Sequence, residues 1–244
     1  MNELASRTLA QIVTGNHRTA AVFEKYHLDF CCKGKRSLQQ ACTEQNISVE
    51  DLLKELEGIS SANQPAFPFD RLSLSQLCEH IVSTHHHYVK NELPQLLAYA
   101  EKVASKHGQR HPELYKIFEA VAAVKEEMTL HMQKEEVILF PRIKELEKFA
   151  GHEHGQANLS VTYLQAPITM MEHEHDHAGS LLAEIRGLSD NYTAPQDACT
   201  TYKLLFAALQ AFEMDLHQHV HLENNILFPR SVKLAEELNK SDLN

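Results

Sequence analysis

Apolar residues recur every three to four positions along most of the chain, and few stretches alternate with a period of two. This spacing is typical of amphipathic helices, so the pattern predicts an all-α protein. After residue 72 we expect four long helices with short connections, an arrangement that forms an up-down-up-down bundle. The expected helices cover residues 73–106, 111–148, 167–189 and 195–238, with Ser73 as the first N-cap and breaks at 107–108, 151–165 and 189–195.

The first part of the chain is organised differently. Shorter apolar stretches predict helices from Ser6 to about Phe23, near residues 38–42 and over 49–56, with a break around 27–34. Residues 58–72 contain Gly, Ser, Asn and two Pro, which is a composition typical of a linker. We therefore divide the chain into a small helical domain (1–59), a linker (60–72) and the bundle (73–244).

A twelve-residue segment occurs twice. The sequence HMQKEEVILFPR at 131–142 returns as HVHLENNILFPR at 219–230, with seven of twelve positions identical and a period of 88 residues. A weaker counterpart relates His86 to His175, which are 89 residues apart. This repetition indicates a duplicated helix pair, so a group supplied by the first pair should be supplied again by the second.

The repeated segments place histidine and glutamate on the predicted core faces. Residues four apart lie on one face of a helix, so His131 points the same way as Glu135, and His219 the same way as Glu223. Both pairs lie within apolar stripes, formed by Ile117, Val124, Met128 and Ile138 in one case and by Leu205, Phe212, Leu216 and Ile226 in the other. His86 and His175 also lie on apolar stripes, although His85 remains an alternative to His86.

Six polar side chains are therefore expected inside the bundle: His86, His131, Glu135, His175, His219 and Glu223. Burying two carboxylates and four imidazoles is costly unless something compensates their charge and polarity. Two divalent metal ions would do so, each with two imidazoles and with the carboxylates as bridges. A mixed nitrogen and oxygen set suits iron or manganese. The excess of imidazole over carboxylate predicts a weakly oxidising di-iron centre in which an oxo bridge is the main anionic ligand.

Composition narrows the choice of function. The chain has 17 His and no Trp, which favours a metal or proton function. Its net charge of −10 argues against nucleic acid or an anionic membrane surface as a partner. No apolar run approaches the ~20 residues of a membrane span. The first residues lack the basic and apolar regions of a signal peptide, so we expect a cytoplasmic protein.

The remaining histidines and cysteines are less informative. His173, His177, His217 and His221 are expected on the solvated side or edge of the bundle, and His152 and His154 in a loop. Five cysteines do not indicate a disulfide framework, and Cys42, Cys78 and Cys199 are expected in the core. Cys31 and Cys32 are either two small residues at a helix break or a redox or metal-relay pair whose thiol pKa is lowered by Lys33 and Lys35.

Four motifs carry a resemblance to a known family. They are Asp29-Phe-Cys-Cys-Lys-Gly34, the two His-x-x-x-Glu segments that continue to Leu-Phe-Pro, Glu174-His175-Asp176 and Leu222-Glu-Asn-Asn225. Over nearly its whole length the chain resembles the iron–sulfur cluster repair di-iron proteins (the RIC, or YtfE/ScdA, family), whose bundle is hemerythrin-like. The resemblance implies that the same six side chains hold two non-haem, oxo-bridged iron ions.

The resemblance also implies a function. Such proteins restore iron–sulfur clusters damaged by oxidative or nitrosative stress, are thought to supply iron from the di-iron site, and have a proposed reactivity toward nitric oxide. Damaged iron–sulfur proteins would be the partners, and the protein would be a monomer or a homodimer. The alternative is a reversible carrier or sensor of oxygen or nitric oxide, but a simple carrier has no need of vicinal thiols. A small ferroxidase or iron store is disfavoured because storage needs a cage.

Overall fold

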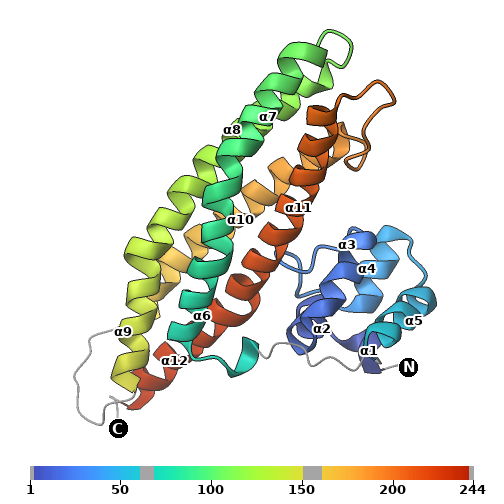
Figure 1. Cartoon of the computed structure of the whole chain (residues 1–244). Helices are drawn as coiled ribbons and strands as arrows, with labels where there is room; N and C mark the ends of the chain where they lie inside the picture. The colour runs from blue at the N-terminus through green and yellow to red at the C-terminus, as the bar shows by residue number, and fades with distance from the viewer. Residues whose placement is uncertain (1–2, 61–68, 151–160, 242–244) are drawn as a thin grey trace.

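The computed structural model describes residues 3–60, 69–150 and 161–241. Within these ranges every regular element is helical, apart from one isolated bridge between Thr8 and Ser37, which confirms the expected all-α fold. Four long helical rods run side by side, and a group of short helices lies beside the last of them (Figure 1). No helix in the described ranges is long and apolar enough to cross a membrane.

Three of the four rods consist of consecutive helical segments, and the third is a single helix. The first comprises α6 (Leu74–Ile81), η3 (Val82–His86) and α7 (His87–His107), and the second α8 (Glu113–Lys134), η4 (Glu135–Leu139) and α9 (Phe140–Ala150). The third is α10 (Val161–Leu188), and the fourth comprises α11 (Thr200–Leu222), η5 (Glu223–Leu227) and α12 (Phe228–Ser241).

The rod boundaries match the expected ones in part. Ser73 is the N-cap of α6, and its hydroxyl and the Gln76 side chain form a reciprocal capping box. The fourth rod begins at Thr200, five residues later than expected. Its preceding connection contains Asp190, Asn191 and Tyr192, which all have positive φ and cannot belong to a helix. The expected break at 151–165 lies partly outside the described residues, and α10 already begins at Val161.

Three π-helical segments, η3, η4 and η5, interrupt the rods. A π segment inserts one residue into the helical ladder and rotates all the following side chains, and such segments are frequent at functional sites. The rotation corrects one expectation from the sequence: Ile138 is 43% exposed, whereas Leu139 and Phe140 are buried in its place.

Two apolar clusters fill the bundle, one on either side of the level at which His175 lies. Along α10, Leu164, Ile168 and Met171 belong to the lower cluster, and Ala178, Leu182 and Ile185 to the upper one. The other three rods divide in the same way. Packing on both sides therefore fixes a narrow layer across the middle of the bundle, and this layer contains polar side chains.

The N-terminal domain consists of short helices: α1 (Glu3–Ser6), α2 (Leu9–Gly15), η1 (His17–Thr19), α3 (Ala20–Lys25), α4 (Leu38–Gln45) and α5 (Val49–Ser60). The single helix expected up to Phe23 is broken at Asn16, whose extended backbone ends α2 and whose side chain caps η1. Of the expected linker, residues 61–68 lie outside the described residues, and 69–71 form the short helix η2 (Phe69–Arg71).

Candidate metal centre

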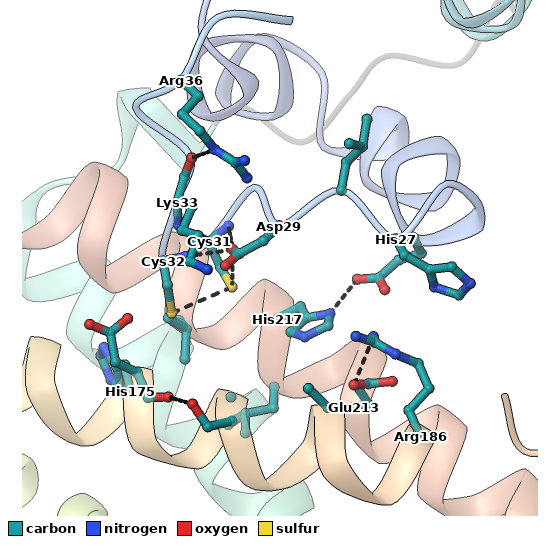
Figure 2. A pocket seen from close by; sticks show the side chains of 18 of the residues that line it. His27, Asp29, Cys31, Cys32, Lys33, Arg36, His175, Arg186, Glu213 and His217 are labelled. Carbon is teal, nitrogen blue, oxygen red and sulfur yellow. Dashed lines mark hydrogen bonds and ion pairs between the residues drawn. The ribbon is translucent and has the colours of Figure 1, made fainter. Parts of the chain in front are cut away.

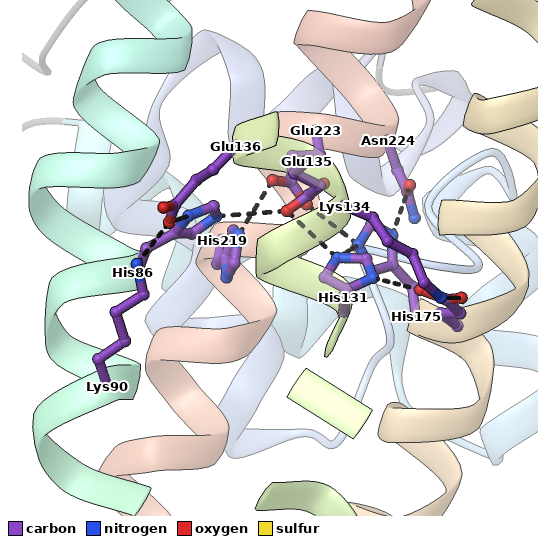
Figure 3. Close-up of polar contacts among 11 residues, drawn as sticks. His86, Lys90, His131, Lys134, Glu135, Glu136, His175, His219, Glu223 and Asn224 are labelled. Carbon is purple, nitrogen blue, oxygen red and sulfur yellow. Dashed lines mark hydrogen bonds and ion pairs between the residues drawn. The ribbon is translucent and has the colours of Figure 1, made fainter. Parts of the chain in front are cut away.

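The structure brings the six sequence-predicted side chains together in the polar layer (Figure 3). One or two come from each rod, and all six are at most 1% exposed. Their ligand atoms form two groups of four in which all atoms lie within 4.8 Å of one another. The 86/219 position comprises His86, His219, Glu135 and Glu223, and the 131/175 position comprises His131, His175 and the same two glutamates.

Each carboxylate contacts one imidazole of the 86/219 position and one imidazole of the 131/175 position. Glu135 Oε2 lies 3.3 Å from His86 Nε2 and 3.3 Å from His131 Nε2. Glu223 Oε1 lies 2.9 Å from His219 Nε2, and its Oε2 lies 3.0 Å from His175 Nε2. Both glutamates are therefore placed to bridge two cations.

The outer nitrogens of three imidazoles have hydrogen-bond acceptors. His86 Nδ1 donates to Glu136 (2.7 Å), His131 Nδ1 to Glu174 (2.9 Å) and His175 Nδ1 to the side-chain oxygen of Asn224 (2.9 Å). An imidazole that donates from Nδ1 presents a lone pair at Nε2 when it is neutral. These partners therefore orient three Nε2 lone pairs toward the interior of the layer.

This interior fits a metal pair. The Nε2 atoms of His131 and His175 face each other at 3.0 Å, between two carboxylates. His86 Nε2, both oxygens of Glu135 and Oε2 of Glu223 are buried and make no hydrogen bond of acceptable geometry with any described residue. Electron-pair donors gathered in this way repel one another unless a cation lies between them. Imidazole and carboxylate are suitable ligands for iron.

The imidazoles and carboxylates of the layer shift one another's pKa values. Burial alone lowers the pKa of the His131 imidazole, but the adjacent Glu135 carboxylate outweighs it and raises that pKa to about 10. Burial raises the pKa of the Glu223 carboxyl, yet His219 and His175 bring it well below its usual range. The surrounding imidazoles lower the pKa of both Glu135 and Glu223, which favours the ionised form that can bind metal, while protons on the imidazoles would compete with metal.

Two surface lysines extend the layer outward. Lys90 Nζ lies 2.6 Å from the Glu136 oxygen that accepts from His86. Lys134 forms an equivalent ion pair with Glu174, the acceptor of His131. Hydrogen bonds from His131 and Lys134 lower the pKa of Glu174 to about 2, so this acceptor stays charged.

Other histidines near the layer have different positions. His85, the alternative to His86, is not in either group; its Nδ1 bonds Asp215 at 3.0 Å. His173 and His177 are exposed, as expected. The expectation for His217 and His221 was wrong. His221 is 3% exposed, and both rings pack edge-on against Phe30 because the N-terminal domain covers this face of α11.

Cys31 and Cys32 lie in the loop after α3, with their sulfurs 3.8 Å apart. Asp29 Oδ1 accepts the backbone N–H groups of Cys31, Cys32 and Lys33 at 2.9–3.2 Å and lies 3.3 Å from the Cys31 sulfur. The hydrogen bond with Cys32 and burial raise the pKa of the Cys31 thiol well above its usual range. The expected lowering by Lys33 and Lys35 was therefore wrong for Cys31.

The loop borders a cavity of about 400 Å³ between the N-terminal domain and the bundle (Figure 2). Asp29, Cys31 and Cys32 line one side, and His175 and His217 line the other. The thiols and His175, at the edge of the polar layer, therefore border the same cavity. On the bundle side, Asn225 of η5 donates to the carbonyl oxygen of Cys31 at 2.9 Å and holds the loop in place.

The other cysteines do not line this cavity. Cys42 and Cys78 are buried, as expected. Cys199 was expected in the core but is exposed, because the fourth rod begins only after it; its sulfur lies 3.3 Å from His107 Nε2.

Comparisons with known proteins agree with this geometry. Residues 79–231 match a family described as the hemerythrin HHE cation binding domain, and residues 5–60 match ScdA_N, described as a domain of unknown function (DUF542). The iron-sulfur cluster repair protein YtfE of Dickeya chrysanthemi is 34% identical over 227 residues, which cover 93% of this chain and 97% of the relative. YtfE of Edwardsiella ictaluri is 36% identical (93% and 96% covered), and that of Yersinia pestis 32% (93% and 97%).

Proposed function

Because the chain belongs to the family of iron–sulfur cluster repair proteins with a hemerythrin-type bundle, we propose that it repairs damaged clusters by donating iron. The residues that would hold two non-haem iron ions are His86, His131, Glu135, His175, His219 and Glu223. The observation that carries the proposal is the close approach of the Nε2 atoms of His131 and His175, 3.0 Å apart, between two buried carboxylates. Bound iron would supply a redox-active cation that the protein can give up.

The protein's own residues control that release. The carboxylates must stay ionised and the imidazoles deprotonated to retain metal, so protonation of the layer favours loss of metal. The buried layer limits the access of water, and the acceptors Glu136, Glu174 and Asn224 keep three rings in the binding orientation. A cytoplasmic site of action follows from the function, since the clients are iron–sulfur proteins damaged by oxidative or nitrosative stress.

We assign Cys31 and Cys32 to the transfer of iron to the client. The cavity that they line also borders His175, which would place both thiols near the ligand layer for transfer of iron. The hydrogen bond with Cys32 and burial raise the pKa of the Cys31 thiol, so binding of iron by this sulfur would require loss of the thiol proton. The vicinal thiols also favour repair over a reversible carrier of oxygen or nitric oxide.

The test is iron transfer to an apo iron–sulfur enzyme. Reduced holoprotein should reactivate the enzyme faster than the same amount of free ferrous iron, and His131→Ala and Glu135→Ala should abolish the gain. His87→Ala removes an exposed histidine beside the layer and should have no effect. If wild type never exceeds free iron, the repair proposal is wrong and the carrier alternative is favoured.

The same assay tests the cysteines. Cys31→Ser and Cys32→Ser should retain their iron but deliver it more slowly, while Cys199→Ser, which alters an exposed thiol outside the cavity, should match wild type. Unchanged delivery by both cysteine variants would remove the thiols from the proposed route.

A further inference from the structure

The two metal positions differ in how their imidazoles are supported. At the 131/175 position both outer nitrogens have acceptors, Glu174 for His131 and Asn224 for His175. At the 86/219 position only His86 has one. The Nδ1 atom of His219 is buried and has no hydrogen-bond partner among the described residues.

The duplication shows what replaced the missing partner. Glu174, the acceptor of His131, directly precedes His175 in the sequence, and the corresponding residue before His86 is His85. The His85 ring stacks on His219 with centroids 5.5 Å apart and planes 7° apart, and its own Nδ1 is directed to Asp215. An aromatic ring thus stands where the other half of the bundle provides a carboxylate.

An outer acceptor orients a ligating imidazole and increases its basicity, and removal of such an acceptor typically reduces metal affinity about 10–100-fold. His219 lacks this support, while the two bridging carboxylates are common to both positions. Resting on the proposed di-iron function, we infer that the 131/175 position binds its ion at least about tenfold more tightly than the 86/219 position.

Because both carboxylates are shared, an ion can pass from one position to the other within the layer. Whichever ion leaves first, the remaining one settles at the 131/175 position, beside the His175 edge that borders the thiol-lined cavity. The 86/219 position is then a reserve that refills the position next to the cavity. The singly loaded protein is a defined species with its ion on His131 and His175.

Metal titration of the full chain tests this inference without measuring repair. Anaerobic titration of the metal-free protein with Co²⁺, followed by its visible absorption, should give two steps separated by at least about tenfold in Kd. His219→Gln should lose the weak step and keep the tight one, whereas the matched variant His175→Gln should lose the tight step. Far-UV circular dichroism verifies that both variants are folded.

Two further measurements sharpen the test. Anomalous diffraction from crystals grown with one equivalent of Co²⁺ should locate the ion between His131 and His175. His85→Glu restores the missing acceptor and should narrow the gap between the two steps. One step of two equal affinities, or a first ion at the 86/219 position, would overturn the inference while leaving di-metal binding intact. Failure to bind Co²⁺ or Fe²⁺ at all would overturn the proposed function as well.

Discussion

The two halves of the duplicated bundle differ in the residues that follow the buried glutamates Glu135 and Glu223. In the second rod these are Glu136 and Val137, and in the fourth they are Asn224 and Asn225. The first of each pair supports an imidazole of a neighbouring rod, but Val137 is 67% exposed whereas Asn225 holds the cysteine loop. Both halves therefore contain the His-x-x-x-Glu pair, but only the half that faces the N-terminal domain contacts the cysteine loop among the described residues.

The largest expected effect is the loss of bound iron, and substitution of the glutamate in either half of the bundle should cause a similar loss. Glu135 and Glu223 each contact imidazoles of both positions, so Glu135→Ala and Glu223→Ala should each lose about half to all of the bound iron. Metal content after desalting measures this loss. Glu126→Ala, an exposed change on α8, serves as the control. A full complement of two ions in Glu223→Ala would show that the carboxylate is not a bridge.

Removal of metal should destabilise the bundle more than the N-terminal domain. A ligand present at a thousand times its Kd stabilises the folded state by about 4 kcal/mol. Without metal, the layer also retains buried nitrogen and oxygen atoms that face one another without hydrogen bonds among the described residues. Calorimetry of the iron-loaded and chelated protein should therefore show a lower Tm for the chelated form. Equal melting temperatures would contradict a buried ligand set.

Loss of the contact between η5 and the cysteine loop should have a smaller effect, and only substitution in the fourth rod should produce it. Asn225→Ala removes the hydrogen bond to the Cys31 carbonyl, a contribution of about 1 kcal/mol, and leaves Glu223 and Asn224 in place. We expect alkylation of Cys31 to accelerate several-fold while metal content stays unchanged. Val137→Ala, the matching position of the other half, should change neither. An alkylation rate equal to that of wild type would show that Asn225 does not hold the loop.

The sequence was sufficient to predict which six side chains meet in the polar layer, because the spacing of His131 and Glu135 within one helix is a local property. The duplication then identified the second pair, and apolar neighbours indicated which face was buried. The π segments could not be predicted in this way. Their extra residue leaves no mark in the spacing of apolar residues, so Ile138 was placed in the core although it is exposed.

Contacts between segments that are distant in the chain also could not be predicted from the sequence. His217 and His221 lie on the face opposite the ligands, and a helix considered alone exposes that face. Docking of the N-terminal domain buries it, through Phe30 between the two rings. The same docking buries Cys31, so the neighbouring lysines do not determine its pKa. Only the arrangement of the two domains reveals these environments.

The smallest predicted effect concerns the pH dependence of that docking. Burial alone lowers the pKa of the His217 imidazole, but the hydrogen bond to Glu24 at 2.7 Å, with the charges of Glu24, Glu213 and Asp29, raises it above 6.5. A raised folded-state pKa stabilises the protonated form, so the contribution is complete below pH 6.5 and disappears as the pH rises through the folded-state value.

Glu24→Gln removes this contribution from α3 without altering the metal layer. The variant should be less stable than wild type by roughly 1 kcal/mol at pH 6, and the difference should shrink toward zero at alkaline pH. Urea unfolding of the iron-loaded proteins from pH 6 to pH 9 measures the difference. A difference that grew with pH would show that His217 is neutral in the folded protein and that its pair with Glu24 does not stabilise the docked domain.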